Sequence, residues 1–283
     1  MKKWGSLTLM LILTMLVIAA CGNSSNTATT GSGSNEAATS NESTTSSSGA
    51  ATLESVKASG KLRIGTEGTY APFTYHDEAG KLTGFDVDIA TEVSKRLGVE
   101  PEFIETKWDS MIGGLDSKRF DTVFNEVGIT PERQEKYLFS DSYISSKAVL
   151  IVSESNTDIK SFADLKGKKS AQSLTSNLGK IAQENGAELV SVDGFNQAIG
   201  LLSSGRADAT INDNLSFLDL KKQQPDLPIK IVAEEADASQ SGAIFNKGSD
   251  DLVAAVNKAL KDMKDDGTYL KISEKYFGED VSK

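Results

Sequence analysis

The sequence predicts an α/β protein with two lobes, each containing a mostly parallel sheet flanked by helices. From residue 52 onwards, short apolar segments of strand type alternate with longer amphipathic segments of helix type, a pattern typical of parallel sheets. An internal repeat indicates two such lobes. Residues 108–125 and 195–212 align without gaps at an offset of 87 residues and are identical at seven of 18 positions. Because ligands bind beyond the carboxyl ends of strands in open α/β sheets, facing lobes would bring equivalent loops together across a cleft.

The chain begins with a segment that indicates export. Residues 1–20 contain two lysines and then an apolar run from Leu7 to Ala20, long enough for a signal peptide and short for a spanning helix. Small residues precede Cys21, a pattern similar to the lipobox of bacterial lipoproteins. The similarity implies that Cys21 becomes a lipidated N-terminus on the extracytoplasmic face of the cell membrane. The alternative is an ordinary signal peptide that happens to end near a cysteine.

Composition and charge narrow the remaining possibilities. Residues 22–51 are almost entirely Ser, Thr, Asn, Gly and Ala, so residues 21–51 should form a lipid-linked, disordered tether with a span of roughly 30 Å. Cys21 is the only cysteine in the chain, which excludes an internal disulfide and a cysteine metal site. The formal charge is −10 and the sequence has no basic cluster, so we expect no nucleic-acid partner.

We expect the first lobe to comprise residues 52–146 and 240–283, and the second to comprise residues 147–239. The chain would cross between them twice, near Ser145–Val152 and Glu234–Ala243. The first lobe should contain, in order, a strand at Lys61–Gly65, a loop with Glu67 and Tyr70, a helix after Gly84, a strand at Val99–Ile104 and a helix from Trp108.

Three acids in these helices are interpreted as ordinary helix features. Asp86 and Asp88 lie in the first turn of the helix after Gly84, where carboxylates interact favourably with the helix dipole. Asp109 follows Trp108 and should cap the helix that begins there.

The segment Phe120–Arg133 is predicted to form the centre of the site. It reads as a buried strand up to Asn125, a loop at Glu126–Gly128, and a helix capped by Thr130 with Arg133 in its first turn. A helix N-terminus with a guanidinium beside it suits a carboxylate. The alternative is an ordinary surface arginine, and the second copy of the arrangement favours the functional interpretation.

The second lobe is expected to supply a similar corner. A strand at Gly167–Gln172 leads into the loop Ser173–Asn177, whose hydroxyl groups lie beside the N-terminus of a helix beginning near Leu178. The second copy of the repeat then ends in Asn212, followed by Asp213. The remaining elements are a helix at Asn214–Lys222, a strand at Ile229–Val232, and closing helices at Asp250–Asp262 and Thr268–Tyr276.

Several motifs in order resemble the extracytoplasmic solute-binding proteins of polar amino-acid ABC transporters. They are Gly84-Phe85-Asp86-Val87-Asp88-Ile89, Ile129-Thr130-Pro131-Glu132-Arg133, Phe139-Ser140 and the later Asp213. The resemblance covers residues 52–283 and implies a two-lobed periplasmic-binding-protein-like fold of type II, with a two-segment hinge. Within the family, the cystine-binding branch is most similar at Glu67–Phe73, Asn125-Glu126-Val127, Lys136-Tyr137 and Asn212-Asp213-Asn214. Glu126 departs from the small Gly or Ser that much of the wider family has there.

The resemblance implies a site for a zwitterion that both lobes share. The α-carboxylate of the ligand would bind Arg133 and backbone N–H groups near Gly128. From the second lobe it would also contact Thr175, Ser176 and Asn177. Because both charges of a zwitterion must be paired when it leaves water, an acceptor for the ammonium is required as well.

The acceptor implied by the resemblance is Asp213, with Glu67 as an additional carboxylate. Tyr70 and Trp108 would enclose the apolar middle of the ligand. Glu126 would lie near the expected ammonium site, and Asn125 is a further implied ligand-binding residue. No catalytic residue, metal or cofactor is expected.

The expected function is that of a monomeric, lipid-anchored receptor that delivers L-cystine to an ABC permease in the membrane. Alternatives are another polar amino acid as ligand, or a sensor subunit. A less favoured alternative is an enzyme on the same scaffold, which would use Glu67, Glu126 and Asp213 as its acid and base.

Overall fold

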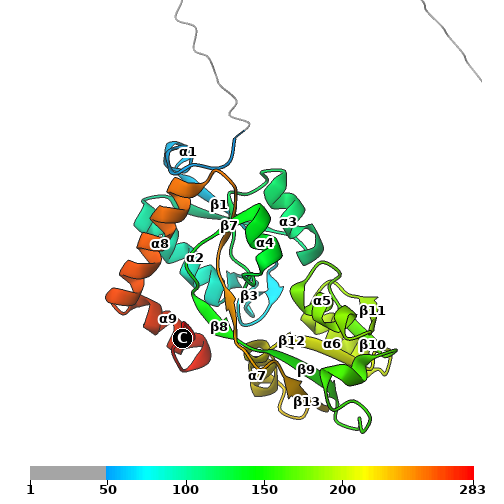
Figure 1. Ribbon diagram of the computed structural model, residues 1–283. Coiled ribbons are helices and arrows are strands. Elements are labelled where there is room, and N and C mark those ends of the chain that lie inside the picture. The colour runs from blue at the N-terminus through cyan, green and yellow to red at the C-terminus, as the bar shows by residue number, and fades with distance from the viewer. Residues whose placement is uncertain (1–48) are drawn as a thin grey trace, which may run out of the picture. The chain divides into compact units, whose positions relative to one another are not determined.

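The computed structural model describes residues 49–283 (Figure 1). The predicted signal peptide, the predicted lipidation site at Cys21 and nearly all of the predicted tether lie outside the described residues. Among the helices of residues 49–283, none combines the length and the apolar character needed to span a bilayer.

Two five-stranded sheets organise the described part of the chain, and we call the region around each sheet a lobe. The first sheet contains, in spatial order, β5 (Glu100–Glu105), β1 (Lys61–Thr66), β6 (Thr122–Val123), β15 (Ile244–Asn246) and β7 (Tyr137–Phe139). The second contains β11 (Glu188–Ser191), β10 (Lys169–Gln172), β12 (Ala209–Asp213), β9 (Ala148–Ser153) and β13 (Ile229–Glu234). In each sheet four strands share one direction, and β15 or β9 runs against its neighbours. The predicted fold class is therefore confirmed.

Helices cover both faces of each sheet (Figure 1). Those of the first lobe are α1 (Leu53–Ser59), α2 (Phe85–Leu97), α3 (Trp108–Asp116), α4 (Pro131–Lys136), α8 (Asp250–Asp265) and α9 (Thr268–Phe277). Those of the second are η1 (Phe162–Leu165), α5 (Asn177–Glu184), α6 (Phe195–Ser203) and α7 (Asn214–Gln223). A small sheet of β2 (Thr69–Tyr70), β3 (Thr74–His76) and β4 (Leu82–Thr83) extends the first lobe.

Strand β9 shows how the apolar pattern produces this layering. Successive side chains of a strand point to opposite faces of its sheet. Leu150 and Val152 accordingly belong to the apolar cluster that includes α5, whereas Val149 and Ile151 belong to the cluster of α6 and α7. Because both faces are covered, the strand reads as a continuous apolar run.

The internal repeat corresponds to equivalent structural units. Helices α3 and α6 both have nine residues, and they begin at Trp108 and Phe195, which are 87 positions apart. Strands β6 and β12 follow them at the centre of their sheets. The two helices therefore present their N-termini from equivalent places in the two lobes.

The chain passes between the sheets twice, through a pair of short antiparallel strands. These are β8 (Ile144–Ser146) and β14 (Ser239–Ser241), which connect to β9 and β15 respectively (Figure 1). They lie within or next to the two crossing segments expected from the sequence. A two-stranded connection of this kind can serve as a hinge between rigid lobes.

Close packing around Phe120 fixes α3 against the first sheet. The ring is fully buried between two glycines. A Cβ atom on Gly65 of β1 would lie 2.6 Å from the ring, and one on Gly114 of α3 would lie 2.5 Å from it. Both glycines therefore allow a helix-to-sheet approach that a larger residue would prevent.

We predict that Gly114→Ala destabilises the protein by about 1–3 kcal/mol, because the added methyl group overpacks a rigid aromatic ring. The matched control is Gly113→Ala on the same helix, where an added Cβ meets nothing within 4 Å. That change should stabilise the helix by up to about 1 kcal/mol. Urea unfolding of both variants checks the prediction, and equal stability of the two would contradict it.

Candidate ligand-binding site

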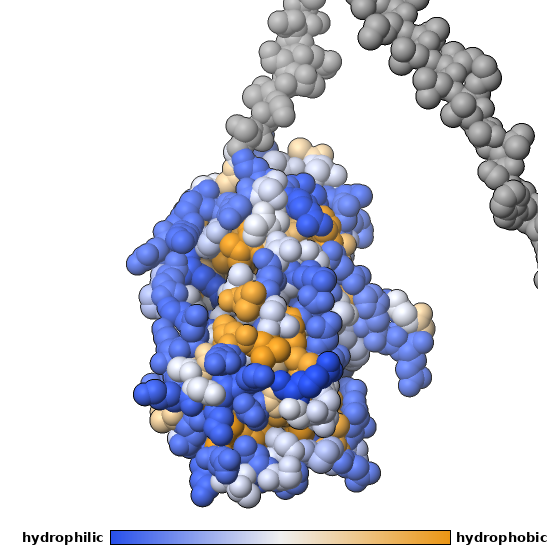
Figure 2. Space-filling model, turned by 90° about the vertical axis from the view of Figure 1, so that its right-hand side faces the viewer, coloured by the Kyte–Doolittle hydropathy of each residue, from blue (hydrophilic) through white to orange (hydrophobic). Residues whose placement is uncertain are grey.

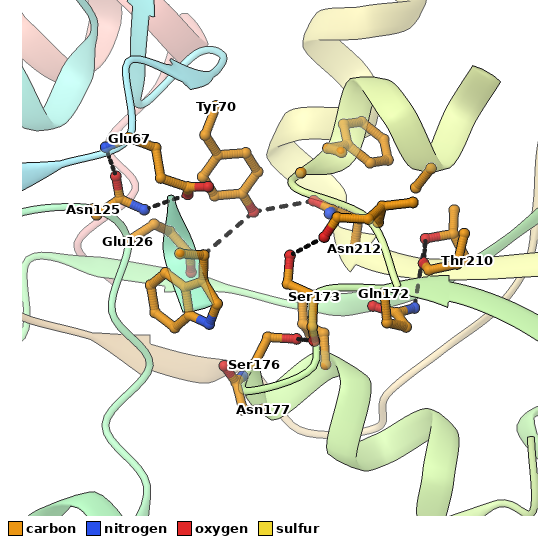
Figure 3. A pocket seen from close by; sticks show the side chains of 17 residues that line it. Glu67, Tyr70, Asn125, Glu126, Gln172, Ser173, Ser176, Asn177, Thr210 and Asn212 are labelled. Atoms are coloured by element: carbon orange, nitrogen blue, oxygen red, sulfur yellow. Dashed lines mark hydrogen bonds between the residues drawn. The ribbon is translucent and has the colours of Figure 1, made fainter. Parts of the chain in front are cut away.

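A cavity of about 60 Å³ lies between the two lobes, beyond the carboxyl ends of strands from both sheets (Figure 3). Its first-lobe wall consists of Glu67, Tyr70, Trp108, Asn125 and Glu126. Its second-lobe wall consists of Ala171, Gln172, Ser173, Ser176, Asn177, Leu178, Val192, Gly194, Phe195, Ala198, Thr210 and Asn212. In the space-filling view, apolar side chains gather in the middle of one face, at the level where the lobes meet (Figure 2).

Seven of the predicted site residues line this cavity: Glu67, Tyr70, Trp108, Asn125, Glu126, Ser176 and Asn177. The other four, Gly128, Arg133, Thr175 and Asp213, are not part of its lining. Arg133 and Thr175 line an adjacent cavity instead, and Gly128 and Asp213 are buried nearby.

Arg133 lies directly behind two residues of the cavity wall. The predicted local structure is present: Thr130 caps α4 by accepting the Arg133 N–H at 3.3 Å. The guanidinium donates to the Gly128 carbonyl at 2.9 Å and to Asn177 Oδ1 at 3.4 Å. It also lies 5.2 Å from the centre of the Trp108 ring, a cation–π distance. Burial lowers the pKa of Arg133.

Asp213 is held by the hinge and by a helix. It is 3 % exposed and caps α7, accepting the Leu215 N–H at 2.8 Å, and it accepts the hydroxyl of Ser146 in β8. Burial raises the pKa of Asp213 to about 6, although these hydrogen bonds oppose the shift. The preceding Asn212 lines the cavity and accepts a hydrogen bond from the Tyr70 hydroxyl at 3.0 Å (Figure 3).

Glu126 is the carboxylate of the first lobe that interacts with Asp213. Its carboxylate accepts from Ser241 Oγ at 2.8 Å and from the Tyr70 hydroxyl at 3.4 Å. Removal from water raises the pKa of Glu126 well above its usual range, the charge of Asp213 raises it further, and Arg133 opposes both. Two carboxylates from different lobes therefore repel one another beside the cavity, and a cationic group placed there would relieve that repulsion.

The backbone of Glu126 has a left-handed conformation that is rare for a residue with a side chain. Its φ angle is 49°, and its N–H donates to Asp86 Oδ2 at 2.6 Å. Asp86 is fully buried, and burial raises its pKa to about 7. The interpretation of Asp86 as a simple helix-dipole partner was thus incomplete, because this side chain fixes the loop that carries Glu126. Asp88 instead accepts hydrogen bonds from Lys275 and Tyr276 of α9.

Glu67 and Asn125 join the ends of two neighbouring strands at the cavity. Asn125 donates to Glu67 Oε2 at 2.7 Å and accepts the Glu67 N–H at 2.8 Å (Figure 3). Burial raises the pKa of Glu67 to about 7, and hydrogen bonds from Asn125 and the Trp108 backbone oppose that shift. The Trp108 indole N–H is buried and has no hydrogen-bond partner among residues 49–283.

Polar contacts between exposed side chains join the two lobes around the edge of the cleft. Lys107 pairs with Asp193 at 2.8 Å, and Lys180 pairs with Glu132. Asp109 accepts the N–H and the hydroxyl of Thr175, at 3.0 and 2.8 Å. The expectation that Asp109 caps α3 was wrong, because the cap position is Lys107 and Asp109 reaches the other lobe. The lobes are therefore in contact around a closed cleft.

Sequence reasoning missed most of the second-lobe wall. Two of the missed residues had a detectable signal, since Phe195 and Asn212 are the repeat equivalents of Trp108 and Asn125, 87 positions earlier. The others missed are Ala171, Gln172, Ser173, Leu178, Val192, Gly194, Ala198 and Thr210. These small, apolar or neutral side chains carry no chemical signature on their own. Within residues 49–283, no group of three or more His, Cys, Asp or Glu side chains could hold a metal ion.

Comparison with known proteins identifies relatives along most of the chain. Residues 62–279 match the family described as bacterial extracellular solute-binding proteins, family 3. The L-cystine-binding protein TcyA of Bacillus subtilis (strain 168) is 54% identical over 230 residues, which cover 81% of this chain and 85% of that protein.

Two solved structures show how the lobes compare. An ancestral arginine-binding protein bound to arginine is 42% identical, covers 77% of this chain and 98% of its own, and superposes with a TM-score of 0.73. The L-cystine solute receptor of Neisseria gonorrhoeae in its unliganded open conformation is 49% identical, covers 82% of this chain and 100% of its own, and gives 0.55. The open receptor is more similar in sequence than the arginine-bound protein, yet it superposes less well. This difference agrees with the contacts between the lobes described above, which are those of a closed cleft.

We predict that Asp213→Asn stabilises the empty protein by an amount that grows as the pH rises from about 4 to above 6. The pKa of Asp213 rises from its ordinary 3.8 to about 6 in the folded state, so stability present below pH 4 is lost as the carboxyl ionises. Full ionisation costs about 3 kcal/mol, and asparagine avoids that cost.

Calorimetric melting of the unaltered protein and of the Asp213→Asn variant between pH 4 and 7.5 measures this difference in stability. Asp226→Asn, an exposed aspartate in the same lobe, is the control and should show no such growth. A stability gain that stays constant across this pH range would contradict the prediction.

Proposed function

The chain belongs to family 3 of the bacterial extracellular solute-binding proteins, and we propose that it binds L-cystine between its lobes for uptake by an ABC importer. The observation that carries the proposal is the 54% identity to a cystine-binding protein, extending over the part of the chain that contains the whole cavity. The relatives described above are two binding proteins and a solute receptor, and we propose no catalytic role for Glu67, Glu126 or Asp213.

The charges around the cavity suit one amino-acid zwitterion. Arg133 provides the positive side, behind Asn177 and Trp108, so the α-carboxylate of the ligand would face these residues. Glu126 and Asp213 provide the negative side, so the α-ammonium would lie near them. Binding would then place an ammonium beside two carboxylates whose pKa values are raised chiefly by burial.

The remaining proposed roles concern residues that contact or support the ligand. Tyr70 and Trp108 would enclose its middle, beside Glu67 and Asn125. Gly128 would act through its backbone, while Ser176 and Asn177 would contact the carboxylate at the start of α5. Thr175 would act indirectly, because Asp109 already binds its hydroxyl and its N–H.

Closure of the two lobes would connect binding to transport. Periplasmic binding proteins close around their ligands by hinge motion, and β8 and β14 supply a hinge here. We propose lobes of residues 52–146 plus 240–283 and of residues 147–239, with a monomer as the working unit. The closed lobes would present the surface that the membrane permease recognises, and lipid on Cys21 would keep the protein at the extracytoplasmic face of the membrane.

We predict that Arg133→Ala weakens binding of L-cystine by about 2–5 kcal/mol, because the ligand's carboxylate loses its cationic partner in a desolvated site. The melting temperature of the empty protein should change little, since the cation is itself disfavoured by burial. Isothermal titration calorimetry with L-cystine and thermal melting give the two readouts.

Lys136→Ala, an exposed lysine on the same helix, is the matched control and should bind cystine normally. Unchanged affinity of the Arg133 variant, or a large loss of stability, would show that Arg133 is structural. Titration of the unaltered protein with the other amino acids decides the ligand, and preference for one of them would replace cystine.

A further inference from the structure

Cystine contains two identical amino-acid halves, and the roles proposed above pair the charges of only one. The second half also carries a carboxylate and an ammonium, which need partners or water. The main cavity of about 60 Å³ has room for about five water molecules, at roughly 10–15 Å³ each. The second half must therefore extend beyond this cavity.

Two other cavities adjoin the main one on different sides. One, of about 640 Å³, is lined by Arg133 and shares Ser176 and Asn177 with the main cavity. The other, of about 360 Å³, shares Glu67 and Gly194 with it, and we call this the distal cavity. The two have no lining residue in common, and Glu67 and Asn177 lie at opposite sides of the main cavity (Figure 3).

Because the main cavity lies between the other two, the position of the α-carboxylate bears on the orientation of the ligand. With its α-carboxylate towards Arg133, a cystine molecule that extends along the line from Asn177 to Glu67 has its disulfide directed towards Glu67. The distal cavity is the next space in that direction, and its lining includes Lys107 and Asp193, one charge of each sign.

Lys107 and Asp193 come from opposite lobes and are paired with one another in this structure. Lys107 Nζ lies 2.8 Å from Asp193 Oδ2, and Gln197 Nε2 also approaches that carboxylate at 3.4 Å. Their side chains are 68% and 50% exposed, so the ion pair contributes little to stability. Either partner can therefore exchange the other for a charge on a ligand at small cost.

We infer that the distal cavity holds the second amino-acid half of a ligand of the cystine type, with Lys107 binding its carboxylate and Asp193 its ammonium. The inference rests on the proposed binding of cystine. It assigns selectivity for double-ended amino acids to two residues outside the main cavity. The competing explanation is that the ion pair is only a latch between closed lobes, which would affect every ligand equally.

Isothermal titration with three ligands separates these explanations. They are L-cystine, the mixed disulfide of cysteine with 3-mercaptopropionate, which lacks the distal ammonium, and that with cysteamine, which lacks the distal carboxylate. Lys107→Gln should weaken cystine and the mercaptopropionate disulfide about fivefold and leave the cysteamine disulfide unchanged. Asp193→Asn should weaken cystine and the cysteamine disulfide about fivefold and leave the mercaptopropionate disulfide unchanged.

Lys61→Gln is the matched control. It breaks an exposed ion pair with Glu102 at the start of β1, the end of the strand that lies away from the cleft. It should alter none of the three affinities. Equal weakening of all three ligands by Lys107→Gln and Asp193→Asn would identify a latch and overturn the distal site, as would no weakening at all. If the unaltered protein fails to bind L-cystine, the proposed function falls as well, which distinguishes that failure from failure of the distal site alone.

Discussion

Glu126 and Asp213 come from different lobes, yet the charge of Asp213 raises the pKa of Glu126, because little water remains to screen the two groups. Each is also fixed in place: Asp86 holds the strained backbone of Glu126, and the end of β12 together with the first turn of α7 holds Asp213. Ionisation of both carboxyl groups is therefore unfavourable while the lobes are closed. An ammonium group placed between them would favour their ionised forms, because it would supply the opposite charge that burial otherwise denies them.

The architecture brings these groups together because the two lobes repeat one design. In both sheets the central strands end at the cleft, and α3 and α6 begin there with the aromatic residues Trp108 and Phe195. The rim contacts that join the lobes involve exposed side chains such as Lys107 and Asp193, and such pairs are weak. Exposed ion pairs of this kind therefore add little to the stability of the closed arrangement.

The sequence was sufficient to predict the fold and the first-lobe wall, but it was insufficient for the second. Thr130, Pro131 and the alternation of strands and helices are local signals, and the structure has the elements they predict. The gapless repeat identified α3 and α6. It also aligned Phe195 with Trp108, although Phe195 was not included among the predicted site residues. Distances across the cleft depend on how two distant segments pack, which explains why Asp109 was assigned to its own helix when it reaches Thr175. The same limit applies to Asp213, whose position behind Asn212 is set by tertiary packing.

The two hinge strands each hold one of the paired carboxylates through a serine hydroxyl. Ser146 of β8 donates to Asp213, and Ser241 of β14 donates to Glu126. These serines are close in the same short ladder, where Ser146 faces Ser239 and Ser241 faces Ile144. Each of the two strands that connect the lobes therefore contacts one of the carboxylates through a serine side chain. A rotation of the lobes about these strands would shift both serine hydroxyls, so it would also change the hydrogen bonding of both carboxylates.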